Sequence, residues 1–224
     1  TSNGSVADTV VVFAKTDEDA GNKGISSFVV RPESDDGFIV EGTEHKLGDK
    51  GCPTAELRFD GLRLHEDRLL GGEGEGFIQS LKTLNGGRIS IAARGVGIAR
   101  AAKDAAADYA TDREQFDQPI AEFQAIQHKL ADMDTKVSAA KLLMHKAADL
   151  KMRDEDYIKA AAQAKLYASE VSREVANEAI QVHGGYGYTK DFPVERYYRD
   201  AKLNEIYEGT SEVLRNTIAQ RMLG

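Results

Sequence analysis

The most restrictive feature of this sequence is a stripe of apolar residues spaced alternately three and four positions apart. The first stripe lies within residues 123–144, and a second, built from smaller residues, lies within 161–182. Because an α-helix has about 3.6 residues per turn, such spacing places a stripe on one helix face. Two consecutive stripes predict an antiparallel helical hairpin packed within a bundle. The stripes are Phe123, Ile126, Leu130, Met133, Val137, Ala140 and Met144, then Ala161, Ala164, Ala168, Val171, Val175, Ala179 and Val182.

The sequence after Gly76 has a helical composition throughout. It is rich in Ala, Lys, Glu, Leu and Gln, which have high helix propensity. We expect a further helix over about 77–110 and a terminal helix after Thr210. Together with the hairpin, these helices predict an antiparallel four-helix bundle.

The first 70 residues carry strand signals instead. Short β-branched or aromatic runs, punctuated by Gly and Pro, lie at 9–13, 25–30, 38–40 and 55–59. They predict antiparallel β structure, so the fold class is α+β. We expect part of a β domain over 1–73 and a helical bundle domain over 74–224. Because the sequence opens immediately before a strand, we also expect this chain to be a fragment of a longer protein.

Composition narrows the functional classes. With 37 acidic and 29 basic residues and no segregated basic stripe, the chain is not expected to bind nucleic acid. Its acidity fits ordinary solubility and a high-salt environment equally well. No apolar run approaches the roughly 20 residues of a membrane span, and no secretory signal is visible, which predicts a cytoplasmic location. One cysteine and five scattered histidines predict neither an internal disulfide nor a metal site.

Two glycine-containing segments interrupt the helical pattern. Gly86 and Gly87 stand inside a predicted helix, where each costs up to about 1 kcal/mol, so we expect another group to approach closely there. Arg88 follows directly. It could bind a phosphate or a carbonyl-bearing ligand, and the alternative interpretation is a helix-surface arginine over a kink. The loop His183–Tyr188 lacks the spacing of a phosphate-binding motif and is best interpreted as a helix C-cap turn.

Glu208 is a candidate base. It lies between Tyr207 and Gly209, ahead of a helix capped by Thr210 or Ser211. A partly desolvated carboxylate in such a place can abstract a proton. An acidic residue that only favours the helix N-terminus is the alternative interpretation.

These irregular segments also form a pattern. Arg199–Lys202 followed by Ile206–Arg215 resembles the carboxyl-terminal signature of acyl-CoA dehydrogenases. The resemblance extends over essentially the whole chain, whereas the family's first helical domain and the start of its β domain have no counterpart. Further matching segments are Ser2–Asp8, Lys46–Gly51, Leu69–Phe77, Arg113–Phe116, Phe123–Ile126 and Gln181–Gly187.

The resemblance implies FAD-dependent α,β-dehydrogenation of an acyl-CoA thioester. Glu208 would remove the α-proton while a hydride passes from the β-carbon to flavin N5. The main-chain N–H of Glu208 and a flavin ribityl hydroxyl would hold the thioester oxygen. Electrons would pass to an electron-transfer flavoprotein, and the enzyme would be a homotetramer built as a dimer of dimers.

The resemblance also assigns residues to binding roles. Asn85, Arg88 and Gly209 match substrate contacts, and Gly87 shows that the family's alternative base position carries no carboxylate. The positions that match FAD contacts are Ser2, Arg113, Gln115, Phe116, Phe123, Gln124, Gln181, Gly185, Thr210 and Glu212.

Three positions depart from the family pattern. Asp117 replaces the usual Gly, Asn85 a common Asp, and Glu212 a common Gln. Asp tolerates a left-handed backbone, so the turn at Asp117 is expected to form. The charge of Glu212 is expected to weaken binding of the FAD pyrophosphate. Two alternatives stay open: an acyl-CoA oxidase that uses oxygen, and a non-catalytic helical oligomerisation or interaction module.

Overall fold

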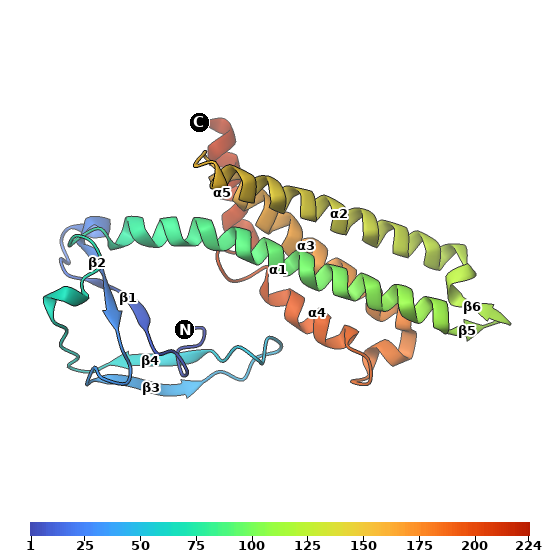
Figure 1. Cartoon of the computed structure of the whole chain (residues 1–224), viewed down its shortest axis with the longest axis horizontal. Coiled ribbons are helices and arrows are strands. Elements are labelled where there is room, and N and C mark those ends of the chain that lie inside the picture. Colours follow the sequence, from blue (N-terminus) through green and yellow to red (C-terminus); the bar gives the residue numbers. More distant parts are fainter. The chain divides into compact units, whose positions relative to one another are not determined.

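The computed structural model describes residues 1–224 and divides into two compact units, Thr1–Thr83 and Leu84–Gly224. Figure 1 shows the order of the elements along the chain. The long helix α1 (Gly76–Asp112) contributes to both units, because the division falls inside it.

The first unit consists of two separate antiparallel strand pairs and short 3-10 turns. β1 pairs with β2, and β3 pairs with β4, with a register irregularity between Val40 and Gly42. All four predicted strands form, so the expected antiparallel β structure is confirmed. The elements are β1 (Val10–Lys15), η1 (Gly21–Gly24), β2 (Ile25–Val30), β3 (Phe38–Thr43), β4 (Ala55–Phe59) and η2 (Glu66–Arg68).

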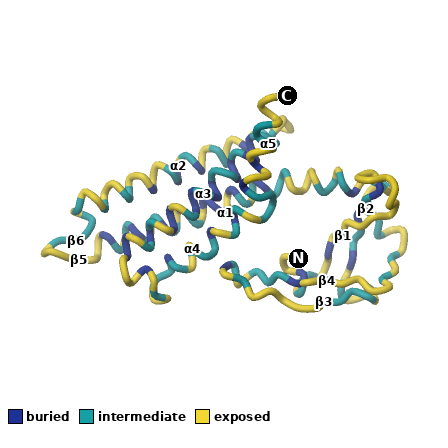
Figure 2. Tube along the Cα trace, turned by 180° about the vertical axis from the view of Figure 1, so that it is seen from behind, coloured by how far each residue is buried: buried dark blue, intermediate teal, exposed yellow.

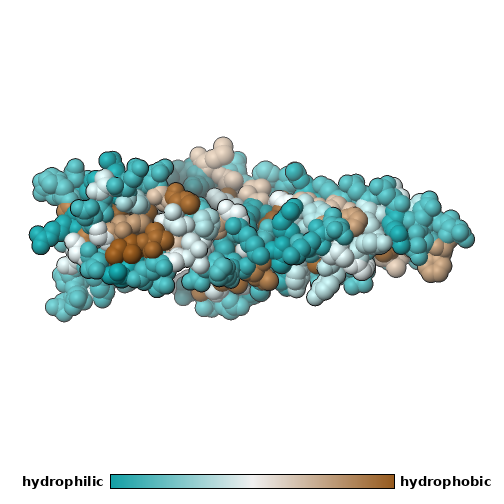
Figure 3. Space-filling model, turned by 90° about the horizontal axis from the view of Figure 1, so that it is seen from below, coloured by the Kyte–Doolittle hydropathy of each residue, from teal (hydrophilic) through white to brown (hydrophobic).

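The core of this first unit is small. Val10, Val30 and Ala55 are buried, whereas Phe13 and Phe59 remain exposed. Figure 3 shows apolar side chains gathered on one face over these strands. Two two-stranded sheets bury too little apolar surface to form a full sandwich.

The second unit is helical apart from one short hairpin. The predicted helices form, and the fold class α+β is confirmed, but α4 was not predicted. Only Val194 and Ala201 of that helix are buried, so its sequence lacks a long apolar stripe. No helix is long and apolar enough to cross a membrane. The elements are β5 (Glu114–Gln115), β6 (Gln118–Pro119), η3 (Ile120–Glu122), α2 (Gln124–Met152), α3 (Ile158–His183), η4 (Gly184–Tyr188), α4 (Val194–Leu203) and α5 (Ser211–Leu223).

The core of the helical unit centres on α3. All seven residues of its predicted stripe are buried, and Figure 2 shows α3 as largely buried along its length. In α2, Met133, Val137 and Ala140 are buried, while the flanking stripe residues are partly buried. α1 and α3 approach closely at Gly95, where an added Cβ would lie 2.8 Å from the carbonyl oxygen of Ala168. The two backbones therefore touch at this point.

An aromatic cluster closes the end of α3. The buried His183 ring stacks on Tyr109 with centroids 4.2 Å apart, and Phe192 lies edge-on to it at 5.2 Å. His183 Nδ1 lies 2.8 Å from the carbonyl oxygen of Ala179, a contact that places the ring proton on Nδ1. Burial lowers the pKa of His183, and the hydrogen bond to Ala179 only partly opposes this. The folded protein therefore holds this imidazole neutral at pH 7.

We predict opposite effects for two glycines of α1. Gly95→Ala should destabilise the protein by about 1–3 kcal/mol, because the new methyl group meets rigid backbone. Gly97→Ala is the matched control: its Cβ would meet nothing within 4 Å, so it should stabilise by up to about 1 kcal/mol through helix propensity. Thermal unfolding measures both. Equal changes in Tm for the two variants would contradict the close contact of α1 and α3.

We also predict that stability decreases as the pH falls from 7 to 5, in part through His183. The pKa of His183 is lowered in the folded state, so the unfolded chain binds a proton first, near its ordinary value of about 6.5. His183→Leu should therefore flatten the dependence of Tm on pH in this range, and His145→Gln controls for loss of an exposed histidine. An unchanged slope in His183→Leu would contradict the buried neutral ring.

Candidate active site

The segment between α4 and α5 holds Glu208 in a strained turn. Glu208 has φ +55° and Gly209 has φ +95°, so two consecutive residues adopt positive φ. For a residue other than glycine this costs about 1–2 kcal/mol. The N–H of Ser211 donates to the carbonyl of Glu205 at 3.0 Å, and the Thr210 side chain caps α5. These contacts hold the backbone of the turn on both sides of Glu208.

The Glu208 carboxylate lies directly against the bare backbone of α1. A Cβ added at Gly87 would fall 2.7 Å from Glu208 Oε2 and 3.2 Å from its Cδ. A Cβ added at Gly86 would meet only the Lys151 side chain, whose Nζ would lie 2.9 Å away. The predicted close approach at this glycine pair is therefore confirmed, and Gly87 makes room for the carboxylate.

Arg88 lies beside this carboxylate with an unused donor. Its side chain is only 8% exposed, Nη1 donates to Asn85 Oδ1 at 2.9 Å, and the buried Nε has no partner. Burial lowers the pKa of Arg88, and the negative charge of Glu208 acts against this. A Cβ at Gly209 would lie 3.6 Å from Arg88 Nη2. The structure thus brings together Asn85, Arg88, Glu208 and Gly209, which we call the base cluster.

The base cluster combines a carboxylate with unused hydrogen-bond donors. None of the main-chain hydrogen bonds uses the N–H of Glu208 as donor, and Arg88 Nε is also unpaired. A carboxylate can take a proton, and nearby donors can stabilise negative charge that develops on an oxygen. The arrangement suits abstraction of a proton next to a carbonyl group.

Lys165 is a further member of this region that the sequence analysis missed. Its side chain is fully buried, and Nζ donates to the carbonyl oxygen of Gly209 at 2.5 Å. Burial and the charge of Arg88 lower the pKa of Lys165 to about 8, opposed by nearby glutamates. The available signal was its spacing: Lys165 follows Ala161 by four residues and precedes Ala168 by three, so it lies on the buried face.

Three of the predicted FAD contacts line one cavity of about 530 Å³ at the end of α3: Arg113, Gln115 and Gly185. The Arg113 guanidinium lies 5.7 Å from the centre of the Tyr186 ring and takes part in no ion pair. A Cβ at Gly184 or Gly185 would meet nothing within 4 Å. This cavity therefore offers an uncompensated cation beside accessible main chain.

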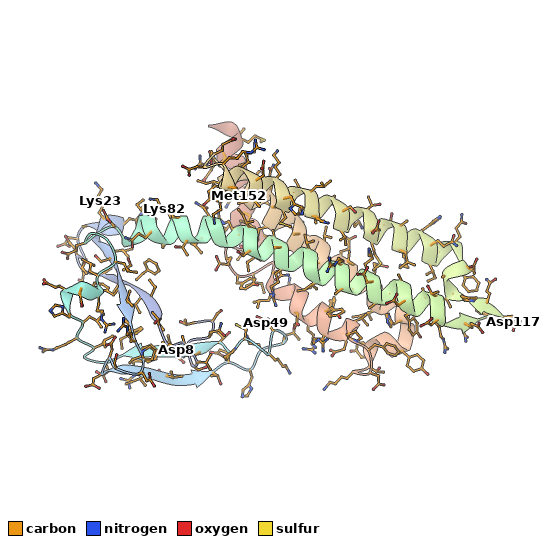
Figure 4. All side chains as sticks on the ribbon, in the orientation of Figure 1. Asp8, Lys23, Asp49, Lys82, Asp117 and Met152 are labelled. Carbon is orange, nitrogen blue, oxygen red and sulfur yellow. The ribbon has the colours of Figure 1, made fainter.

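Other predicted FAD contacts lie near this cavity in sequence but do not line it. Phe116 is 87% exposed in the β5–β6 hairpin and contacts Phe123 edge-on at 6.1 Å. Gln124 begins α2, and Gln181 is exposed on α3. Phe116 and Asp117 have φ of +54° and +64°, so the left-handed turn forms with Asp in place of Gly, as expected. Figure 4 shows Asp117 at the tip of this hairpin.

Thr210 and Glu212 lie in a separate small pocket of about 260 Å³ at the start of α5. The main-chain N–H of Glu212 and, to a smaller extent, the Thr210 hydroxyl lower the pKa of the Glu212 carboxyl. Arg173, Lys202 and Arg215 also line this pocket, which gives it a mixed charge. Ser2 belongs to the first unit, where it bridges to Thr54.

Comparisons with known proteins place these residues in a family. The family model described as "Acyl-CoA dehydrogenase, C-terminal domain" matches residues 74–223. An acyl-CoA dehydrogenase of Bacillus subtilis is 49% identical over 99% of this chain and 58% of its own length. A subunit of a caffeyl-CoA reductase–Etf complex from Acetobacterium woodii is 43% identical over 97% of this chain and 57% of its own length.

A solved structure shares the fold. The butyryl-CoA dehydrogenase of Megasphaera elsdenii superposes with a TM-score of 0.97 at 42% identity, covering 100% of this chain and 58% of that one. The chain thus spans slightly less than three-fifths of the length of these relatives. Because the family model matches residues 74–223 and the relatives are 43–49% identical over nearly the whole chain, the chain belongs to the acyl-CoA dehydrogenase family.

Proposed function

We propose that the whole protein catalyses FAD-dependent α,β-dehydrogenation of an acyl-CoA thioester, with Glu208 as the base. The observation that carries the proposal is the Glu208 carboxylate held against Gly87, beside the buried Arg88. Membership of the acyl-CoA dehydrogenase family supports the reaction class.

Proton removal is the step that this chain supplies. A carboxylate can remove an α-proton efficiently only if the developing negative charge on the thioester oxygen is stabilised. We assign this stabilisation to the main-chain N–H of Glu208, which has no internal main-chain acceptor. Asn85, Arg88 and Gly209 belong to the same base cluster, and we propose that they contact the substrate.

The residues at the end of α3 fit part of an FAD site. Arg113 offers a cation without a carboxylate partner, Gln115 a side-chain amide, and Gly185 an open backbone, all suited to an anionic dinucleotide. When bound, FAD accepts a hydride. Thr210 lies at the N-terminus of α5, where main-chain N–H groups favour phosphate. Glu212 adds an opposing charge there, and we expect it to weaken FAD binding. Ser2, Phe116, Phe123, Gln124 and Gln181 are kept as proposed FAD contacts on the family resemblance.

We further propose an electron-transfer flavoprotein as the redox partner. The relative from Acetobacterium woodii is a subunit of a reductase–Etf complex, which supports such a partner. The same relative is named as a reductase, so an Etf partner is compatible with either direction of electron flow. A homotetrameric assembly and a cytoplasmic location stay predictions from the sequence.

We predict that Glu208→Gln abolishes most turnover. The amide has nearly the same shape but cannot accept the proton, so the rate should fall at least about 100-fold. The experiment uses the whole protein with FAD, mixed without oxygen with acyl-CoAs of several lengths, and follows loss of flavin absorbance. Arg113→Gln is the companion variant, which should lower FAD affinity more than the rate of the FAD-saturated protein.

The outcomes separate the alternatives. Loss of absorbance in the wild type but not in Glu208→Gln, with FAD still bound, supports the proposal. Rapid return of absorbance and hydrogen peroxide on admission of oxygen would indicate an oxidase. Unchanged turnover in Glu208→Gln would overturn the role of this residue, and absence of FAD binding would favour the non-catalytic module.

We predict that Gly87→Ala impairs catalysis although alanine favours the helix. The new methyl group would lie 2.7 Å from Glu208 Oε2, so the carboxylate must move. A displacement of this kind costs about 100-fold in rate. Gly86→Ala is the matched control, because the nearest atom is the end of the flexible Lys151 side chain. Equal activity of the two variants would contradict the role of Gly87.

A further inference from the structure

Lys165 is an uncommon feature of the helical core. It is the largest fully buried side chain, and it lies on the packed face of α3 among alanines. An ammonium group loses its hydration there, which is costly unless another group compensates. No carboxylate forms an ion pair with it, and its hydrogen-bond acceptor is the main-chain carbonyl of Gly209. The placement therefore calls for an explanation beyond packing.

The acceptor of Lys165 belongs to the turn that carries the proposed base. Gly209 directly follows Glu208, and both residues have positive φ. The contact of 2.5 Å ties this turn to α3. On its other side, the Glu208 carboxylate rests on Gly87 of α1. The turn is thus held between two helices of the core.

Two cations act on the Glu208 carboxylate. Arg88 approaches from α1 and Lys165 from α3, and the charge of Glu208 raises the pKa of each. Both cations therefore lie within electrostatic range of this carboxylate. The charges of Glu205, in the segment after α4, and of Glu212, at the start of α5, also raise the pKa of Lys165. The charge of Arg88 lowers it.

We propose that Lys165 is a positioning residue for the reaction, which fixes the Glu208–Gly209 turn. This inference rests on the proposed function of Glu208. Lys165 does not need to touch the substrate, because it acts through the Gly209 carbonyl. A purely structural lysine would instead affect folding without lowering the kcat of the folded protein.

The kinetic test compares Lys165→Met with Lys159→Met in the whole protein. Methionine keeps the length of the side chain but lacks the charge and the donor. We expect kcat to fall at least about tenfold in Lys165→Met, because the base is misplaced, with KM changed less than about twofold. Lys159, on the same helix and only partly buried, should tolerate the change.

A second measurement tests the buried ammonium without using activity. The pKa of Lys165 is about 8 in the folded protein and 10.5 ordinarily. Between these values the unfolded chain holds a proton that the folded chain has released, so stability rises with pH. The Tm of the wild type minus that of Lys165→Met should therefore increase from pH 8 to pH 10.5.

The outcomes distinguish the two proposals. A wild type that turns over no acyl-CoA would defeat the proposed function, while the Tm comparison would still report on Lys165. If the wild type is active and Lys165→Met shows the same kcat, the positioning role is overturned. A Tm difference that does not change with pH would overturn the charged, buried state on which the inference depends. Lower kcat with little change in KM supports the positioning role.

Discussion

Backbone contact between α1 and α3 is the constraint on which the helical unit depends. Gly95 and Ala168 bring the two main chains together, and the alanines of α3 allow this approach along the helix. Because the helices lie so close, short side chains and main-chain atoms from both can reach one turn. Gly87 of α1 and Lys165 of α3 both contact the Glu208–Gly209 turn in this way. The packing of the core thus determines the position of the candidate base.

A buried polar network also holds the residues that directly precede this turn. Arg94 donates to Asn204 Oδ1 at 2.8 Å and to the Tyr207 hydroxyl at 2.7 Å. Asn204 is fully buried and also donates to Ser172 Oγ, at 3.4 Å, on α3. Satisfied polar networks in a core restrict alternative arrangements, because any movement leaves a buried group unpaired. This restriction compensates for the unfavourable backbone conformation of Glu208.

Local patterns in the sequence predicted the elements, and they also predicted part of the site. The stripes of α2 and α3 and the strand runs are local patterns of apolar residues, so they could be recognised without the structure. Helix α4 was not predicted, because only two of its residues, Val194 and Ala201, are buried and the helix has no apolar stripe. The glycine pair signalled a close approach, but nothing local identified Glu208 as the group that approaches Gly87. Lys165 was missed for the same reason: its partner Gly209 lies 44 residues away. The roles of Glu208 and Gly87 came from the family resemblance, the role of Lys165 came from the structure, and all three stay proposals.

The contact between Gly87 and Glu208 also constrains how this site can evolve. An added Cβ at position 87 would lie 2.7 Å from Oε2, so any residue larger than glycine there displaces the carboxylate from its present place. Because the two residues are in direct contact, the effects of substitutions at positions 87 and 208 are coupled rather than additive. Position 87 thus constrains the base without taking any part in the chemistry.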